Sequence, residues 1–423
     1  MSRNRGLGHW VGDPGVWHTH FRTHTYNNDK DATAQSPAAG LATSTWRTFN
    51  DPRLFEPTPL QDSLDETLST YVSGDMRPRR EAPSPDDFVR RVHGYEILNQ
   101  YVVGGQWRAL ALAAEASIVE TAAHEERTLL KYWVYRTMAL IQLNVCELAS
   151  RELSRLEQAS QYATTARRAV RRGKSPTIAW PFELRVLRAQ APGLAHGSWG
   201  VSIDRLSALL RGCRRAAATK VAEDEQDDEL VYKQRGFHIT LLIIGCIVKM
   251  HDSALATQVL DRLVSESPPD PLLLSAAARL YLQLGGISSA ERLFVQVEGL
   301  ATKDDKVTLM NRALYAVAAG KWDSAREMFA KIHADHPERV AAANNMALCD
   351  LYLGNPQAML NGLKQLMAAA PTAAGTSELL VFNYCTGLDL HYDGPRLRDA
   401  KVKKMVEVAT WAGDGFDTDS FKL

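Results

Sequence analysis

Three histidines near the start of the chain are the first side chains whose type and spacing could bind a metal. His18, His20 and His24 fall in the stretch "HTHFRTH". A zinc site usually needs four ligands, and no cysteine or carboxylate stands at ligand spacing beside them. A polar segment that happens to contain histidines is the simpler interpretation, so we expect no metal site there.

Aspartates near the end of the chain are a second candidate. Asp414, Asp417 and Asp419 have some resemblance to the first ligands of a calcium loop. Such a loop also needs a glutamate at its twelfth position, and the sequence ends before that position is reached. We therefore expect no calcium site.

Motifs for catalysis are missing from the sequence. There is no GxxxxGKS/T phosphate loop, no GxGxxG segment after a strand pattern, and no GxSxG nucleophile turn. The five cysteines, which form no CxxC pair, are Cys146, Cys213, Cys246, Cys349 and Cys385. Four of them lie in apolar helical stretches, where a free cysteine packs as a small hydrophobe. We expect a non-enzyme without cofactors, kept in a reducing compartment.

The overall charge is balanced, because 49 basic and 49 acidic side chains cancel. This balance gives no support for nucleic-acid binding. The best charged candidate is local, since helical spacing places Arg168, Arg171 and Arg172 on one face. That face could contact an acidic partner or anionic lipid headgroups. A solvated helix end, where cations are favoured, is the alternative.

The hydropathy pattern predicts a cytosolic protein. The first residues contain no apolar core of a secretory signal. The longest apolar run, at about Phe237–Val248, is well short of the ~20 residues that span a bilayer. Membrane contact is therefore expected to be peripheral only.

Regularly spaced glycines, small residues and aromatics define the elements that carry these side chains. Gly285, Gly320 and Gly354 follow one another at 35 and 34 positions. A period of ~34 residues with two helical stretches per unit is typical of tetratricopeptide (TPR) repeats. The residues expected to pack these repeats are Ala256, Ala278, Tyr281, Gly285, Ala290, Phe294, Gly320, Ala325, Phe329, Gly354 and Leu363.

Each repeated position has a physical reason. Glycine can take the positive φ that ends a first helix, and a small residue after it lets the second helix approach closely. An aromatic residue one turn later fills the space between helices. One helix pair cannot bury its own apolar face, so the units stack into a solenoid. An ordinary helical bundle is the alternative that we weigh against it.

The predicted organisation has two parts. Residues 1–85 are read as low-complexity and mostly disordered, with one short helix possible at Gln61–Val72. Residues 86–423 are read as an all-α, TPR-like solenoid of about 13–15 helices. Within it, regular repeats cover about 237–371 and capping helices cover 372–411.

Several segments together resemble one known family. "WPFELRVLRAQAP" with "SIDRLSAL", "PLLLSAAARLYLQLGGISSAERLFVQVEG" and "AAANNMALCDLYLGN" occur in the same order as similar segments of that family, as do "ELLVFNYCTGLDL" and the final "GDGFDTDSFKL". The family is subunit 12 of the TRAPP (transport protein particle) vesicle-tethering complex. The resemblance covers about Phe88–Leu423, and the first 85 residues find no counterpart. Met359 stands where a small residue is usual.

The resemblance implies a non-catalytic scaffold subunit in the arms of a TRAPP III-type complex. Its expected partners are the large subunits 8, 11 and 13 and, through them, the small-subunit core, which activates a Rab-type GTPase. ER-to-Golgi traffic and autophagy are the implied processes. The implied location is the cytoplasmic side of the early secretory pathway, with membrane contact only through the complex.

A TPR adaptor for the peptide tails of chaperones or other partners is the alternative function. Such an adaptor needs lysine and asparagine on successive first helices to clamp a carboxylate. Ser275 and Arg279 hold these positions in one unit and Gly245 in the unit before it, while Asn311 and Asn345 alone do not make the clamp.

Overall fold

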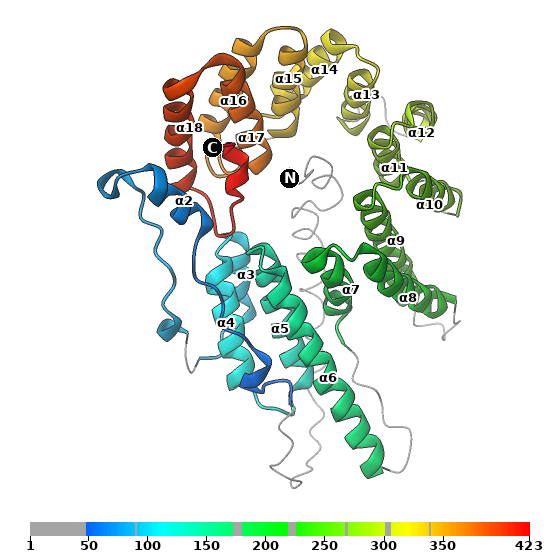
Figure 1. Ribbon diagram of the computed structural model, residues 1–423. Helices are drawn as coiled ribbons and strands as arrows, with labels where there is room; N and C mark the ends of the chain where they lie inside the picture. The colour runs from blue at the N-terminus through cyan, green and yellow to red at the C-terminus, as the bar shows by residue number, and fades with distance from the viewer. Residues whose placement is uncertain are drawn as a thin grey trace. The chain divides into compact units, whose positions relative to one another are not determined.

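The structure is a computed structural model that describes residues 48–88, 91–171, 180–218, 226–266, 270–300, 306–337 and 340–423. All regular secondary structure in these ranges is helical (Figure 1). The chain divides into two compact units. The first contains the described residues up to Glu56, Ile118–Thr137 and Cys146–Val259; the second contains Pro57–Ser117, Met138–Val145 and Leu260–Leu423.

The described part of 86–423 folds into consecutive helices joined by short turns, which confirms the all-α, TPR-like architecture. The sequence predicts about 13–15 helices, and sixteen α-helices are found in the described part of 86–423. They are α3 (Tyr95–Val103), α4 (Trp107–Glu120), α5 (Glu126–Gln142), α6 (Cys146–Arg171), α7 (Phe182–His196), α8 (Trp199–Ala218), α9 (Gln226–Lys249), α10 (Ser253–Glu266), α11 (Pro271–Gln283), α12 (Ile287–Leu300), α13 (Lys306–Ala318), α14 (Trp322–Asp335), α15 (Val340–Tyr352), α16 (Pro356–Ala369), α17 (Glu378–His391) and α18 (Gly394–Ala409).

Three glycine turns between first and second helices share one geometry. Gly285, Gly320 and Gly354 have φ of 80°, 71° and 82°. In each turn the N–H of the next residue donates to a carbonyl five positions earlier, at 2.7 to 2.8 Å. This bond is the one that ends a helix in a Schellman motif, and it requires the left-handed conformation that glycine adopts at little cost. The 34-residue period in the sequence therefore corresponds to a repeated backbone structure.

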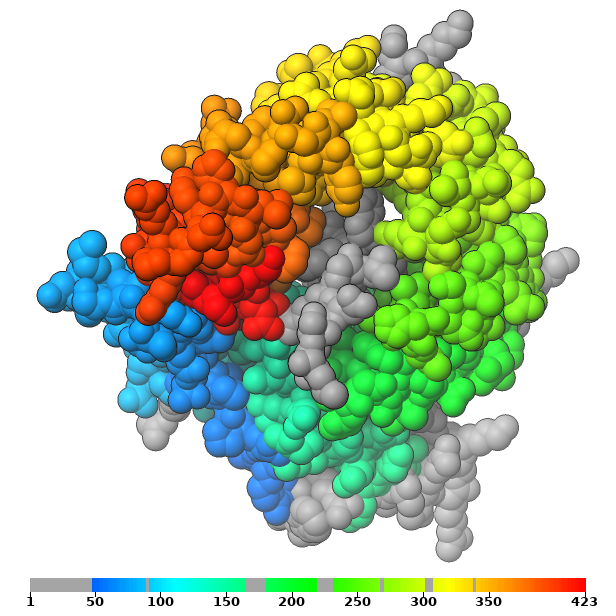
Figure 2. Space-filling model, turned by 45° about the horizontal axis from the view of Figure 1, so that its top comes forward, coloured from blue at the N-terminus to red at the C-terminus, as the bar shows by residue number. Residues whose placement is uncertain are grey.

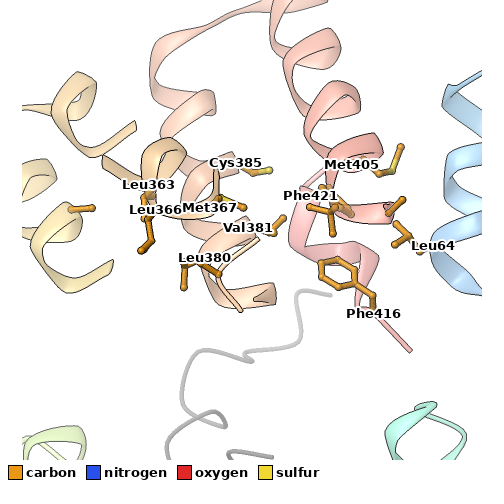
Figure 3. Packing of buried hydrophobic residues seen from close by; sticks show 14 of the residues in the cluster. Leu64, Leu363, Leu366, Met367, Leu380, Val381, Cys385, Met405, Phe416 and Phe421 are labelled. Carbon is orange, nitrogen blue, oxygen red and sulfur yellow. The ribbon is translucent and has the colours of Figure 1, made fainter. Parts of the chain in front are cut away.

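In the second unit each helix from α11 to α17 packs against the next one along the chain. Between α13, α14 and α15 the core is built on Ala325, Phe329 and Ile332. Towards the C-terminus a larger apolar core joins helices α15 to α18 with the last residues of the chain. This core contains Leu363 of α16 and, from the C-terminal residues, Phe416 and Phe421 (Figure 3). Such layers give each helix pair a place to bury the apolar face that it cannot bury alone.

The described part of the chain begins at residue 48, before the boundary predicted at residue 85. Residues 48–88 lie on the helical core and contain the helix α2 (Ser63–Tyr71), where the sequence allows a short helix at 61–72. Leu64 and Leu68 of α2 are fully buried in the C-terminal core, and Figure 3 labels Leu64 near Phe416 and Phe421. In Figure 2 the blue of this segment lies directly against the red and orange of α18 and the C-terminal residues, which it also contacts. The structure therefore describes packed residues before the boundary expected at residue 85, while residues 1–47 lie outside the described part.

The 3-10 turn Pro85–Asp87 precedes α3, which begins at Tyr95 after Gly94. Among the described helices, none combines the length and the apolarity that crossing a membrane would require.

Candidate functional site

The first helices of successive pairs line a groove on the surface of the second unit. Residues of α11, α13 and α15 line a groove of about 420 Å³. Most of the lining is apolar, with Leu272, Val307, Met310 and Val340 among its side chains, and Arg279 is a cation in it. We call the exposed side of α11, α13, α15 and α17 the first-helix surface. An apolar groove with one charged group can hold a protein segment, because such grooves gain binding energy from area and specificity from the charge.

Polar side chains beneath this groove tie neighbouring first helices together. Arg279 donates from Nε and an Nη atom to the amide oxygen of Asn311, at 3.0 and 2.9 Å. Asn311 in turn donates from Nδ2 to the hydroxyl of Ser275 at 2.9 Å. The next first helices repeat the arrangement, since Asn383 donates to the amide oxygen of Asn344 at 2.9 Å. These bonds, which are buried or partly buried, fix the spacing of the helices and therefore the shape of the groove.

The residues weighed for a carboxylate clamp are engaged within the chain. Asn311 is buried and bonds to both Arg279 and Ser275, and Asn345 accepts a bond from Asn344 at 3.3 Å. Gly245 lies in α9, which belongs to the first unit. A clamp would need amide groups that point away from the fold toward a ligand. The groove thus offers mainly apolar surface, with Arg279 as its polar feature.

Helix α17 extends the first-helix surface with an apolar stripe. Leu379, Phe382 and Leu390 are 40%, 45% and 59% exposed, and their spacing of three and eight residues places them on one face. The ammonium of Lys422 lies 5.2 Å from the centre of the Phe382 ring and 2.8 Å from a carboxylate oxygen of Asp389. Exposed apolar side chains on one helix face with charged groups at their edge are the composition of a protein-binding surface.

The repeat-packing residues lie inside the fold. Most are almost fully buried: Ala256, Ala278, Tyr281, Ala290, Phe294, Ala325, Phe329 and Leu363. Met359, in the place where a small residue is usual, is also fully buried. The Tyr281 hydroxyl donates to the Asp261 carboxylate, and burial raises the pKa of this phenol above its usual range. These residues shape the surface without forming part of it.

The candidates for chemistry lie in different places. Arg168 and Arg171 end α6 with side chains outside the described part, and Arg172 lies outside the described residues with the three N-terminal histidines. The interpretation of the arginines as a contact patch therefore stays a prediction. Asp414 pairs with Arg108 at 2.7 Å, and the Asp417 carboxylate accepts from the backbone N–H of Asp419. In the described ranges no three His, Cys, Asp or Glu side chains come together as metal ligands.

The buried cysteines have the environment of packing residues. Burial raises the pKa of Cys246 and Cys349 to about 11 and that of Cys385 to about 12. A thiol with such a pKa stays protonated near neutral pH, whereas a nucleophile or metal ligand must be a thiolate. These side chains therefore fill space between helices.

An ionic cluster that the sequence did not reveal joins residues 57–88 to the C-terminal residues. Arg80 donates to the Asp62 carboxylate at 2.6 Å and to the backbone carbonyls of Ala409, Ala412 and Gly413 at 2.8 to 2.9 Å. Arg108 pairs with Asp414 and donates to the carbonyl of Leu60 at 3.0 Å. We call Asp62, Arg80, Arg108 and Asp414 the clasp.

Glycines make the close approach of the clasp possible. A Cβ on Gly413 would lie 2.7 Å from the carbonyl oxygen of Gly105, and one on Gly415 would lie 2.4 Å from that of Gln142. The backbone N–H of Asp414 donates to the same Gly105 oxygen at 2.9 Å. The two glycines of the "GDGF" ending were the only sequence signal for this contact, and a glycine pair alone does not say what it approaches.

Comparisons with known proteins agree with the resemblance described above. No model of a known protein family matches the chain. A mouse protein, trafficking protein particle complex subunit 12, is 29% identical over 262 residues, which cover 57% of this chain and 32% of that protein. The human protein of the same name is 28% identical over 262 residues, covering 57% and 35%. The chain is thus similar to subunit 12 over part of its length. It spans about a third of the length of these two curated relatives.

Two solved structures of TPR proteins are also similar to the chain. A tetratricopeptide repeat protein from Parabacteroides merdae ATCC 43184 is 12% identical, covering 66% of this chain and 98% of its own, with a TM-score of 0.38. The TPR domain of P58(IPK) is 12% identical, covering 74% and 97%, with a TM-score of 0.18. With scores this low, the argument for TPR-like repeats rests on the helix pairs and glycine turns themselves.

Proposed function

We propose that the chain is a non-catalytic scaffold subunit of a TRAPP III-type vesicle-tethering complex. The observation that carries the proposal is its relation to subunit 12 over 57% of its length. The apolar stripe of α17 supports it, because exposed leucine and phenylalanine side chains on one helix face are typical of surfaces that a partner covers.

The mechanism in this proposal is shape. Each helix from α11 to α17 packs against its neighbour, and the buried Asn and Arg bonds set the distance between first helices. A partner bound along α11 to α17 is therefore held at a fixed spacing from one bound elsewhere on the same unit. No bond is made or broken in this role.

The proposed partners are the large arm subunits 8, 11 and 13, and through them the small-subunit core. The chain then supports activation of a Rab-type GTPase only indirectly, in ER-to-Golgi traffic and autophagy. The proposed location is the cytoplasmic side of the early secretory pathway, reached through the complex. The relation to subunit 12 supports these assignments.

The test is purification of the tagged full chain from its own cells, with mass spectrometry of the co-purifying proteins. We expect stoichiometric TRAPP subunits with the unchanged chain, and their loss with Leu379→Glu combined with Phe382→Glu. The matched control is Val295→Glu, which changes a 62% exposed residue of the second helix α12. Recovery of no TRAPP subunit with the unchanged chain would refute the proposal. Equal recovery with all variants would place the interface elsewhere.

A peptide adaptor is the second candidate, and the groove of about 420 Å³ on α11, α13 and α15 favours it. An adaptor should bind short acidic peptide tails, including those of chaperones, as a purified chain without other subunits. Met310→Asp should abolish that binding, because it places a like charge in the apolar lining that the tail must cover. Absence of peptide binding at about millimolar concentration, a weak-affinity limit near 4 kcal/mol, would exclude this candidate.

A further inference from the structure

A short extended segment of the first unit is bound to one helix pair in the way a peptide is bound. Residues 48–56 contain a single 3-10 turn, Pro52–Leu54, and the residues on either side of it, Asp51 and Phe55, are extended. Trp133 of α5 donates from Nε1 to the carbonyl of Phe49 at 2.9 Å. The Asn50 amide donates to the carbonyl of Thr121 at 3.0 Å. The segment contributes no α-helix to the unit and is held by groups of the helical core.

The floor under this segment is a buried ion pair between α5 and α6. Arg136 donates to both carboxylate oxygens of Glu152, at 2.8 and 2.6 Å, and both side chains are almost fully buried. The same pair binds the backbone of Glu56: its N–H donates to Glu152 at 3.0 Å, and its carbonyl accepts from Arg136 at 3.0 Å. Arg136 as donor and Glu152 as acceptor thus bind the backbone of one residue, whatever side chain that residue carries.

The aromatic residue before Glu56 is contacted by an indole and by a guanidinium. The Phe55 ring stacks on Trp133 at 4.8 Å with an interplanar angle of 10°, and the Arg136 guanidinium carbon lies 4.9 Å from the ring centre. Stacking and cation–π contacts both require an aromatic ring at this position. An aliphatic side chain of similar size would keep only the apolar area.

The side chain of Glu56 adds a requirement for an acid. Its two oxygens contact Arg151 at 2.8 Å and Arg155 at 2.6 Å, both on the α6 side of the site. The side-chain bond from Arg151 lowers the pKa of Glu56 from its usual value. These arginines are about half and two-fifths exposed, so solvent reaches the contact and salt will weaken it.

We propose that Trp133, Arg136, Glu152, Arg151 and Arg155 form a motif-binding site for extended protein segments in which an aromatic residue is followed directly by an acidic one. Residues 48–56 are its resident ligand, and a partner carrying such a segment binds by displacing them. The site lies on α5 and α6, which are not helices of the first-helix surface, so it goes beyond the proposed function.

The resident ligand occupies its own site because it is part of the same chain. Covalent attachment gives it a high effective concentration, and a free segment must compete with that. Weakening the resident ligand should therefore open the site without any change in the helices that form it. Phe55→Ala with Glu56→Ala in the full chain does this, because both side chains belong to the ligand.

The probe is a fluorescent peptide with the sequence of residues 48–60, TFNDPRLFEPTPL, titrated into the purified full chain and followed by anisotropy. We expect saturable binding to the Phe55→Ala, Glu56→Ala chain and at least tenfold weaker binding to the unchanged chain. A peptide with alanine in place of its Phe-Glu pair should bind at least tenfold more weakly. Arg151→Ala with Arg155→Ala, added to the opened chain, should also weaken binding, whereas Arg262→Ala in α10 should not.

A second measurement covers the case in which the opened chain does not fold, as judged by circular dichroism. In the unchanged chain, excess peptide should speed hydrogen exchange at the amide of Glu56, and the alanine peptide should not. Three results would overturn the proposal: no binding to a folded opened chain, equal binding to the opened and unchanged chains, or, for an unfolded opened chain, no change in exchange under excess peptide.

Discussion

Removing the guanidinium of Arg80 is the most informative change in the clasp. Arg80→Met keeps the aliphatic stem and deletes the group that binds Asp62 and the carbonyls of Ala409, Ala412 and Gly413. The side chains of Arg80 and Asp62 are only 7% and 2% exposed, so water cannot readily replace the lost donor. Breaking a buried ion pair by removing one partner costs about 3–5 kcal/mol.

The lower end of this range applies here. Asp62 keeps the N–H of Leu64 at 3.1 Å and an Nη atom of Arg108 at 3.5 Å, so its charge is not left entirely alone. We therefore expect about 3 kcal/mol, which corresponds to an exchange rate about a hundredfold higher for amides that the clasp protects. The amide of Asp414, bonded to the Gly105 carbonyl, is the best probe.

The assay is hydrogen exchange of the full chain read out by peptide mass spectrometry over residues 408–416. Arg79→Met is the matched control, because it changes the exposed neighbouring arginine. Faster exchange with Arg80→Met and an unchanged rate with Arg79→Met would show that the clasp protects these amides. If both variants changed the exchange rate by less than about threefold, which is under 1 kcal/mol, the clasp would not hold the C-terminal residues in place.

Three further predictions follow from particular contacts. Gly413→Ala should lower the stability of the second unit by about 1–3 kcal/mol, because its Cβ would meet the Gly105 oxygen at 2.7 Å. Gly299→Ala, in open space on α12, should raise that stability by about 0.5–1 kcal/mol. Denaturation followed by circular dichroism measures both variants, and loss of stability in both would contradict this assignment. Cys246 and Cys385, with pKa values raised by burial to about 11 and 12, should escape brief alkylation at pH 8 in the native chain and react fully in denaturant; rapid native labelling would show that they are accessible. Arg151 lowers the pKa of Glu56 in the folded chain, so the contact between them stabilises the 48–56 segment at pH above the usual pKa of 4.5 and is lost as pH falls through the lowered pKa. Hydrogen exchange at the Glu56 amide, normalised for the intrinsic effect of pH, should therefore rise on acidification. Glu56→Gln should remove that dependence.

The repeated part of the fold could be predicted from the sequence because its information is local. Gly285, Gly320 and Gly354 mark turns that need positive φ, and Ala290 and Phe294 mark a face by their spacing. Each signal repeats at a fixed period, so each confirms the others. The family resemblance rests partly on these segments and also on "WPFELRVLRAQAP", "SIDRLSAL", "ELLVFNYCTGLDL" and the C-terminal ending.

The segment at residues 48–88 could not be predicted in the same way. "NDPRLFEPTPL" has no helical or strand period, and it is held by contacts with α5 and α6 that lie about a hundred positions away. Arg80 stands in "RPRREAP", which reads as a solvated linker because nothing local shows that one of its arginines is buried. Order of this kind comes from tertiary contacts, which composition does not record.

The most direct test of the central claim is the size of the particle that contains the chain in cells. Extract from cells expressing the unmodified chain is separated by sedimentation, and the chain and the TRAPP core subunits are followed by quantitative mass spectrometry across the fractions. The account predicts that the chain co-sediments with the core subunits, well ahead of its own mass of 46.9 kDa. Sedimentation at the mass of the chain alone, apart from the core subunits, would contradict it.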